Sequence, residues 1–196
     1  MKKVVYIRST KSEAIYRVGV VDTDSGESTD CTVNVRRHTE LSALSVGDML
    51  DASAEEMLLL ADEEHRAYKR ALSLLSYADN NERTLKRKLT MHGIRADVAE
   101  DVCREMVALG YVDDRRQLSR LIVSEAEKLY GPAKILARLV AKGYNSCDVK
   151  AVMRELCDLG EIDFSALAKR LVDKKYPDGA TVDERRAILY KHGYKG

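Results

Sequence analysis

The sequence predicts a mainly α-helical protein, built of tandem three-helix repeats of helix-turn-helix type in a curved array behind a small N-terminal β-meander. Three observations support this fold class. A ten-residue segment at 85–94 returns without gaps at 135–144 and again at 185–194, and an internal repeat of fixed period marks a repeat architecture. Apolar residues flank each copy at spacings of three and four, as on buried helix faces. The first 37 residues are instead rich in β-branched and aromatic side chains, which favour strands.

The N-terminal region, 1–52, is predicted to contain three strands, at residues 4–8, 15–21 and 31–36. The segment 22–26, between the second and third of these strands, consists of turn-forming residues. Residues 46–50 are predicted to form a turn into a short extended segment. Because so small a meander is barely stable alone, we expect it to pack on the helix that follows.

An acidic linking helix is predicted over 53–64, which contains five Asp/Glu and no Lys/Arg. Ser53 and Glu56 have the spacing of a capping box, in which a serine N-cap and a glutamate three residues later satisfy the first helical amides. Nothing breaks the helical pattern before Tyr77. The sequence therefore allows one long helix or two helices that meet near 62–64.

The repeats are predicted at residues 65–112, 113–162 and 163–196, with the last copy ending after its second helix. Glycines at 93, 143 and 193 each follow the last apolar position of a second helix, where a C′ residue often takes a left-handed conformation. Pro132 is predicted to open a helix. Asp113 or Asp114 is the expected N-cap at the start of the second repeat, and Asp163 is the expected N-cap of the third.

Charge is unevenly distributed along the chain. Residues 1–52 hold seven Lys/Arg and eight Asp/Glu, whereas 65–196 hold 26 Lys/Arg and 19 Asp/Glu. Such a basic array favours a polyanionic or acidic partner, the alternative being a solvated helical surface. The candidate contact residues on the basic face are Arg83, Lys86, Arg87, Lys88, Arg115, Arg116, Arg120, Lys134, Arg138, Lys142, Lys169, Arg170, Lys174, Lys175, Arg185, Arg186 and Lys191.

Catalytic motifs are missing from the sequence. It has no Gly-rich phosphate loop, no HExxH and no Cys/His cluster with metal-ligand spacing, so we expect no enzymatic activity, no metal and no cofactor. His92 and His192 occupy equivalent positions in the last turns of helices, where a partly positive imidazole favours the carbonyl end. Aromatic residues are sparse, with one Phe, no Trp and ten Tyr. Tyr111, Tyr144 and Tyr194 are expected to pack at helix ends.

The cysteines and the apolar pattern indicate a cytosolic protein. Cys31, Cys103, Cys147 and Cys157 show no paired spacing, and the last three are expected to be small buried thiols on helices. No run of about eighteen apolar residues exists that would span a membrane. The first residues lack the apolar core of a secretory signal.

Three segments taken together resemble the RecX family, bacterial regulators of the recombinase RecA. These segments are Gly110–Asp114, then Tyr130–Ile135 followed by Leu139 and Lys142–Gly143, and finally Lys191–Tyr194. The resemblance spans the three repeats and, more loosely, the N-terminal region. The chain departs from the family pattern at Leu118, where an aromatic residue is common, and at Thr84, where the helix often opens with acids.

The resemblance implies a right-handed stack of three-helix repeats that lies in the groove of the RecA filament on single-stranded DNA. It implies modulation, usually inhibition, of filament growth, strand exchange and co-protease activity, and so regulation of recombination, DNA repair and the SOS response. The basic-face residues would then contact DNA or RecA, with duplex DNA as a weaker, non-specific ligand. A monomer with no membrane association is expected.

Two other functions fit the residue pattern. The first is a stand-alone DNA-binding protein that acts through its helix-turn-helix-like repeats. The second is a helical scaffold for a different protein. The scarcity of aromatic and base-reading side chains favours contacts with the nucleic-acid backbone over sequence-specific readout.

Overall fold

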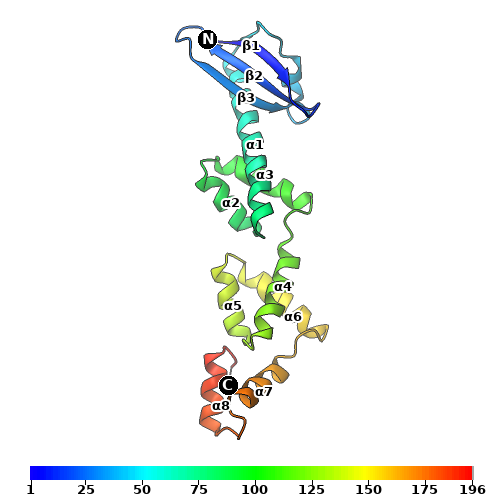
Figure 1. The fold of residues 1–196 in the computed structure, drawn as a ribbon, viewed down its shortest axis with the longest axis vertical. Helices are drawn as coiled ribbons and strands as arrows, with labels where there is room; N and C mark the ends of the chain where they lie inside the picture. The colour runs from blue at the N-terminus through cyan, green and yellow to red at the C-terminus, as the bar shows by residue number, and fades with distance from the viewer. Residues whose placement is uncertain (196) are drawn as a thin grey trace. The chain divides into compact units, whose positions relative to one another are not determined.

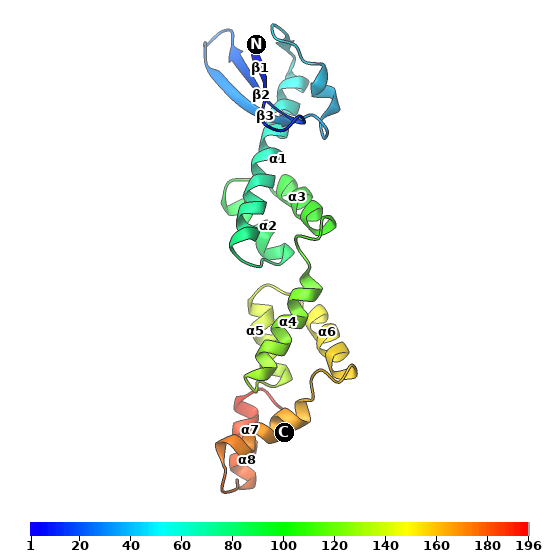
Figure 2. The ribbon, with the colours of Figure 1, turned by 45° about the vertical axis from the view of Figure 1, so that its right-hand side comes forward.

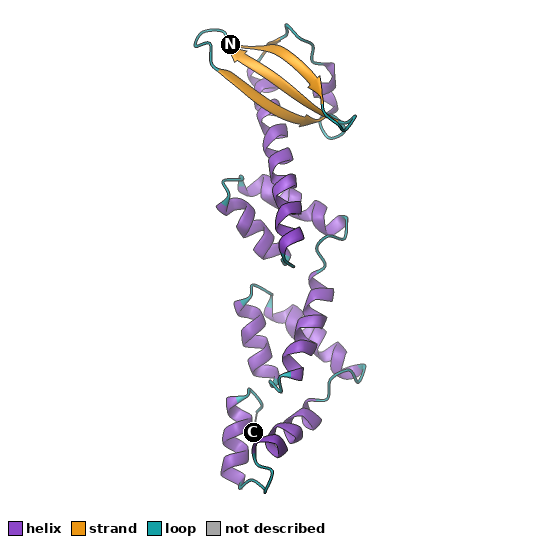
Figure 3. Ribbon diagram, viewed as in Figure 1, coloured by secondary structure: helices purple, strands orange, loops and turns teal. Residues whose placement is uncertain are grey.

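The computed structural model describes residues 1–195 and confirms a mainly helical chain with an N-terminal antiparallel sheet (Figures 1 and 3). Over the described residues it contains eight α-helices and four strands. The chain divides into two compact units. The first comprises Met1–Ala78 with Leu85–Met106, and the second comprises Asp79–Thr84 and the chain from Val107 on.

The sheet is antiparallel with strand order β3-β2-β1-β4. Its strands are β1 (Lys2–Ser9), β2 (Ile15–Asp22), β3 (Ser28–Asn34) and β4 (Met49–Leu50). The three predicted strands are confirmed, and the predicted extended segment pairs with β1 as a fourth. Gly19 in β2 lies under the ring of Tyr6, where any Cβ atom would collide with that ring, so this close packing requires glycine.

Helix α1 (Ala52–Tyr77) is continuous, which decides between the two predicted alternatives. Figures 1 and 2 both show its N-terminal half lying against the sheet. Leu58 and Ala61 on this half are buried with Val4, Val20 and Val33 from the strands. This apolar layer is the core of the N-terminal region, and it stabilises a sheet too small to fold alone.

The predicted capping box at the start of α1 is wrong. Asp51 is the N-cap, and its carboxylate accepts a hydrogen bond of 2.7 Å from the amide of Ala54. Ser53 therefore lies inside the first turn. An aspartate two residues upstream caps the amides equally well and adds a negative charge at the positive end of the helix dipole.

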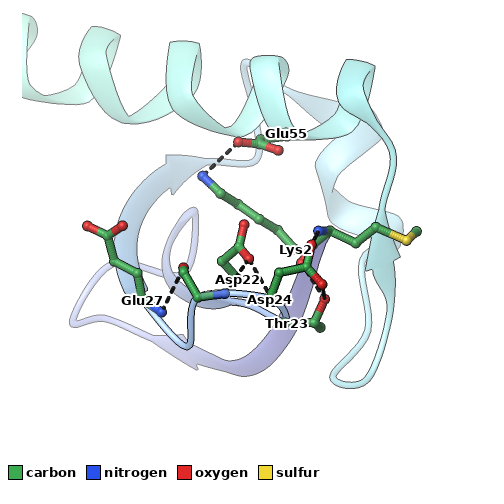
Figure 4. A network of polar contacts seen from close by, with 8 residues as sticks. Lys2, Asp22, Thr23, Asp24, Glu27 and Glu55 are labelled. Carbon is green, nitrogen blue, oxygen red and sulfur yellow. Dashed lines mark hydrogen bonds and ion pairs between the residues drawn. The ribbon is translucent and has the colours of Figure 1, made fainter.

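Carboxylates of the acidic segment hold the first unit together. Figure 4 shows Glu55 on α1 paired with Lys2 on β1, at 2.7 Å between Oε1 and Nζ. Glu63 accepts a hydrogen bond of 2.7 Å from the amide of Arg95. Asp62 accepts one of 2.8 Å from the amide of Thr32. The segment that is most acidic in sequence thus makes contacts with strands and helices of its own unit.

The first repeat combines the C-terminal half of α1 with α2 (Glu82–Met91) and α3 (Ala96–Ala108). Its buried apolar side chains include Ala67, Ala71, Leu85, Leu89, Val98, Val102 and Met106. His92 follows α2, and its Nε2 lies 2.6 Å from the guanidinium Nη2 of Arg70. The predicted contact of His92 with helix carbonyls is therefore replaced by one with a side chain of α1.

The second unit contains the helices of the other two repeats. They are α4 (Asp114–Glu127), α5 (Pro132–Ala141), α6 (Ser146–Asp158), α7 (Phe164–Lys175) and α8 (Val182–Lys191). The predicted helix starts are confirmed, with Asp113 and Asp163 as N-caps and Pro132 in the first turn of α5. His192 ends α8 as predicted, with Nδ1 3.0 Å from the carbonyl oxygen of Ile188.

The predicted left-handed glycines are also confirmed, with φ of +81° at Gly93, +97° at Gly143 and +85° at Gly193. A residue with a Cβ atom is strained in this region, so glycine sets the sharp end of each second helix. The loop after Gly193 carries Tyr194, which is buried, and the corresponding Tyr144 is buried as well. Tyr111, in contrast, is more than half exposed, so its predicted packing role is wrong.

Cys103 is buried as predicted, but Cys147 is exposed and Cys157 is only half-buried. Cys147 lies in the first turn of α6, on the side that faces away from the core. No disulfide links the cysteines of the described residues. Over residues 1–195 every helix is too short or too polar to span a membrane.

Candidate nucleic-acid interface

The end of α8 docks on the start of α5 through backbone hydrogen bonds. The amide of Gly131 donates to the carbonyl oxygen of His192 at 2.7 Å, and the amide of Ala133 donates to that of Gly193 at 3.1 Å. A Cβ atom on Gly131 would lie 2.6 Å from the carbonyl carbon of Gly193. The amides at the start of α5, which have no partner within the helix, thus donate hydrogen bonds to the third repeat. Figures 1 and 2 both show the two segments side by side.

A related joint occurs fifty residues earlier within the second unit. Asn81, at the position of Gly131, donates from its side-chain amide to the carbonyl oxygen of Lys142 at 3.2 Å. The hydroxyl of Thr84 donates to the same oxygen at 3.5 Å. Side chains here replace the backbone donors of the later joint, so the same turn docks in both places through different donors.

A cleft of about 980 Å³ opens beside the later joint. We call it the α8 cleft. One helical face of α8 lines it, with the start of α5 and the residues after α8 completing the walls. Its lining residues are Ala133, Lys134, Asp183, Arg186, Ala187, Tyr190, Lys191, Gly193, Tyr194 and Lys195. Four cationic side chains and one carboxylate give this lining a positive charge.

Lys134 is held in place at the edge of the cleft. Its Nζ lies 4.1 Å from the ring centroid of Tyr130, and the guanidinium of Arg138 lies 5.3 Å from the same ring. Cations over an aromatic face are attracted by its quadrupole, typically by about 0.5–1 kcal/mol at exposed sites. This contact restricts the Lys134 side chain without neutralising its charge.

Four of the predicted contact residues form ion pairs with carboxylates of the protein itself. Lys86 pairs with Glu100 at 2.5 Å, Arg115 with Glu155 at 2.5 Å, Arg120 with Asp79 at 3.0 Å and Arg138 with Glu125 at 2.5 Å. Each of these cations would have to release or share its carboxylate before it neutralised a phosphate. That all seventeen side chains form one basic contact face stays a prediction, in which these four cations must first give up their carboxylates.

The pair of Arg138 with Glu125 differs from the others because Glu125 is buried, with 3% of its side chain exposed. Lys128 approaches the other carboxylate oxygen at 2.9 Å. Burial by itself raises the pKa of the Glu125 carboxyl, but the contacts with Lys128 and Arg138 outweigh burial and hold that pKa below its ordinary value. Arg138 thus fastens α5 to α4 and serves the core of the second repeat.

Most of the remaining predicted cations have no carboxylate partner among the described residues. They are Arg83, Arg87, Arg116, Lys134, Lys142, Lys169, Arg170, Lys174, Lys175, Arg185, Arg186 and Lys191. Lys88 is half-buried on α2. Seven of the unpaired cations belong to α7 and α8, and the α8 cleft brings Lys134, Arg186 and Lys191 together.

The cleft also contains residues that the sequence did not single out. Tyr190 is 81% exposed although it follows two inward-packing residues of α8, and Lys195 lies beyond the helix end. The spacing of Tyr190 from Arg186 was the available signal, because residues four apart lie on one helix face. A cationic cleft with an exposed ring suits a polyanionic ligand with flat groups. No cluster of three or more metal-ligating side chains exists within residues 1–195.

Fold and site together define a class of protein, one in which tandem three-helix repeats follow a small β-sheet and the last helix lines a cationic cleft. No family model matches the chain. Sequence comparison nevertheless finds relatives named "Regulatory protein RecX". One from Escherichia coli (strain SE11) is 33% identical over 148 residues, which cover 66% of this chain and 84% of that protein. One from Stenotrophomonas maltophilia (strain K279a) is 30% identical over 138 residues, covering 68% and 82%. The chain belongs to the RecX family of regulatory proteins.

Solved structures support the fold. A crystal structure of regulatory protein RecX superposes with a TM-score of 0.71 over 100% of this chain and 95% of the other, at 20% sequence identity. RecX from Lactobacillus salivarius gives a TM-score of 0.57, over 69% of this chain and 90% of its own, also at 20% identity. At this identity the likeness concerns the fold alone.

Proposed function

We propose that this protein binds the RecA filament on single-stranded DNA and modulates it by inhibiting its recombinase, ATPase and co-protease activities. The protein would thereby regulate recombination, DNA repair and the SOS response. In this proposal it acts in the cytoplasm as a monomer and performs no chemical step of its own.

Family membership is the single observation that carries the proposal, since the relatives are named as regulatory proteins. The charge of the helices supports it. Arg185, Arg186 and Lys191 on α8 and the basic side chains of α7 have no carboxylate partner among the described residues, and such side chains release counterions when they meet phosphates. A nucleoprotein filament offers both DNA phosphates and a protein surface to them.

The experiment measures ATP hydrolysis by RecA on single-stranded DNA while this protein is added. We expect hydrolysis to slow when the protein is present at well below one copy per RecA, because one molecule that caps or occupies a filament affects many subunits. An unchanged rate at equimolar protein would refute the proposal.

A stand-alone DNA-binding protein is the second candidate, favoured by the succession of helix, glycine turn and helix in each repeat. The face of α5 argues against it, because Arg138 is engaged with Glu125 and a recognition helix needs free side chains for the groove. Tight, sequence-selective binding to duplex DNA without RecA would favour this candidate. Salt-insensitive capture of another, non-recombinase protein would instead favour a scaffold.

A further inference from the structure

We propose that the α8 cleft is a subsite for single-stranded DNA, in which Tyr190 stacks on a base while Arg186, Lys191 and Lys134 hold the flanking phosphates. The inference deepens the proposed function, on which it rests for the identity of the nucleic acid. It assigns DNA contact to one face of the last repeat.

Exposure of Tyr190 is the first argument. A ring that is 81% exposed on a regular helix contributes little to the core. The residues by which α8 packs on the core are the buried Ile188 and the half-buried Leu189. Surface tyrosines on a cationic face are typical stacking platforms, because every base has a flat face and stacking does not depend on sequence.

The cations around the ring are the second argument. Arg186 precedes Tyr190 by one helical turn, about 6 Å along the axis, so both side chains leave α8 on the same face. Lys191 is the next residue along the helix, and Lys134 reaches the cleft from α5. A phosphate on either side of a stacked base therefore meets a cation.

The small residues between these side chains are the third argument. Ala133, Ala187 and Gly193 line the cleft, and because their side chains are small they leave its space open. The cleft volume of about 980 Å³ is at the upper end of the range of roughly 300–1,000 Å³ for small-molecule sites, so a nucleotide fits with room for its neighbours. Among the described residues of the lining Asp183 is the one carboxylate, and it lies at the N-terminal end of α8, about one turn before Arg186.

The combination favours single-stranded nucleic acid over two other polyanions. In duplex DNA the bases are stacked on each other, so their faces cannot meet Tyr190. A peptide of Asp and Glu residues would satisfy the cations but has no flat ring to place on the tyrosine. Only an unpaired nucleotide uses both features of the cleft.

The test is direct binding of a fluorescent oligothymidylate to the full chain at low salt, without RecA. We expect Tyr190→Ala to weaken binding about 5- to 150-fold, the range seen for loss of one base-stacking ring, and Tyr190→Phe to bind like the unaltered protein. Tyr77→Ala is the matched control, because Tyr77 is 93% exposed but lies on α1. Its binding should be unchanged.

An abasic oligomer of the same length separates stacking from charge. On the unaltered protein the abasic oligomer should bind more weakly than oligothymidylate. On Tyr190→Ala the two oligomers should bind with equal affinity. The double variant Arg186→Ala/Lys191→Ala should flatten the dependence of log affinity on log salt by about 1.4, since each phosphate contact of a single strand contributes about 0.7.

Three results would overturn the inference: no binding of oligothymidylate by the unaltered protein, full binding by Tyr190→Ala, or equal binding of an acidic peptide of the same charge. All three outcomes are measured without RecA. If RecA hydrolysis stays unaffected while oligothymidylate binds through Tyr190, the proposed function fails and the subsite stands. If hydrolysis slows although the oligomer does not bind, the reverse holds.

Discussion

Glu125 shows how a single buried charge can organise a helical repeat. Its carboxylate is enclosed between α4 and α5, where Lys128 and Arg138 reach its two oxygens. An unpaired carboxylate at this depth would cost several kcal/mol, so the two cations decide whether burial is tolerated. The core of the second repeat therefore contains one ion pair that its apolar periodicity did not reveal.

We expect Glu125→Gln to lower the free energy of unfolding at pH 7 by about 1–2 kcal/mol, less than for a fully buried pair because Arg138 is partly exposed and solvent compensates it. Chemical denaturation measures the loss, with Glu127→Gln on the exposed side of α4 as control. The folded-state pKa of Glu125 lies below its ordinary 4.5. Its stabilisation is therefore present above pH 4.5 and disappears as the pH falls through the folded-state value. If the free energies of unfolding of the unaltered protein and Glu125→Gln still differ by this amount at pH 2, the assignment is contradicted.

Cysteine reactivity provides a second prediction for single residues. Burial raises the pKa of the Cys31 thiol to about 11, and a thiol rather than a thiolate reacts slowly. Cys147 is exposed. We expect a thiol reagent at pH 8 to modify Cys147 at once and Cys31 only after unfolding. The measurement is mass spectrometry of the labelled protein, with Cys147→Ser as control. Rapid labelling of Cys31 in the folded protein would show that the sheet opens readily.

At the level of secondary-structure elements, the docking of α8 on α5 depends on Gly131. Its φ of −82° is open to any residue, so the requirement for glycine is one of space. We expect Gly131→Ala to lower the free energy of unfolding by about 1–3 kcal/mol, the usual cost of overpacking. Hydrogen exchange should become faster in α7 and α8 and stay unchanged in the sheet.

Gly160→Ala is the comparison for this prediction. A Cβ atom at Gly160 meets no neighbour, but its φ of +74° strains any other residue by roughly 1–2 kcal/mol. Faster exchange localised to α7 and α8 in Gly131→Ala and absent from Gly160→Ala would identify the joint. If both variants behave alike, docking at Gly131 is not what holds the third repeat.

Elements and their ends were largely predictable because the signals for them are local. Glycine after a periodic face, aspartate before a helix and proline in a first turn act within a few residues, and Asp113, Asp163, Pro132 and Gly193 all do what their neighbours indicate. The start of α1 was misassigned because two acceptable caps compete within three residues.

The candidate site was less predictable because side chains distant in sequence form it. The sequence around Arg115 gives no sign of its ion pair with Glu155, forty residues away. The sequence around Lys134 likewise gives no sign that it lies beside one face of α8. The list of basic residues therefore contained both structural ion pairs and unpaired cations. It also omitted Tyr190, whose exposure only the packed structure reveals.

On the scale of the whole molecule, the charge asymmetry of the sequence needs revision. The acidic segment at the start of α1 is engaged with its own unit through Lys2, Thr32 and Arg95. The second unit carries eighteen Lys/Arg and fifteen Asp/Glu, and the first carries fifteen and seventeen. We therefore propose that attraction to a polyanion belongs to the second unit, and within it to α7 and α8, where the basic side chains have no carboxylate partner among residues 1–195.

Charge reversal tests this assignment against the alternative that all repeats contribute alike. We expect Arg185→Glu/Arg186→Glu on α8 to weaken inhibition of RecA hydrolysis more than tenfold, because four units of charge change beside the cleft and phosphates are then repelled. Arg83→Glu/Arg87→Glu on α2 makes the same change in the first repeat, where Lys86 is already paired with Glu100, and should have a smaller effect.

The control for these variants is Lys150→Glu/Arg154→Glu, an exposed pair on α6 that has the four-residue spacing of the α2 pair and lies outside the predicted contact residues. It alters the net charge by the same amount, so it separates a local contact from long-range attraction. Because long-range attraction is screened within about 10 Å at 0.1 M salt, the control should approach unaltered activity at that salt while the α8 variant does not. Equal losses in all three variants would mean that net charge alone brings the protein to the filament. Full activity in both the α2 and α8 variants would mean that the basic face is not the contact surface.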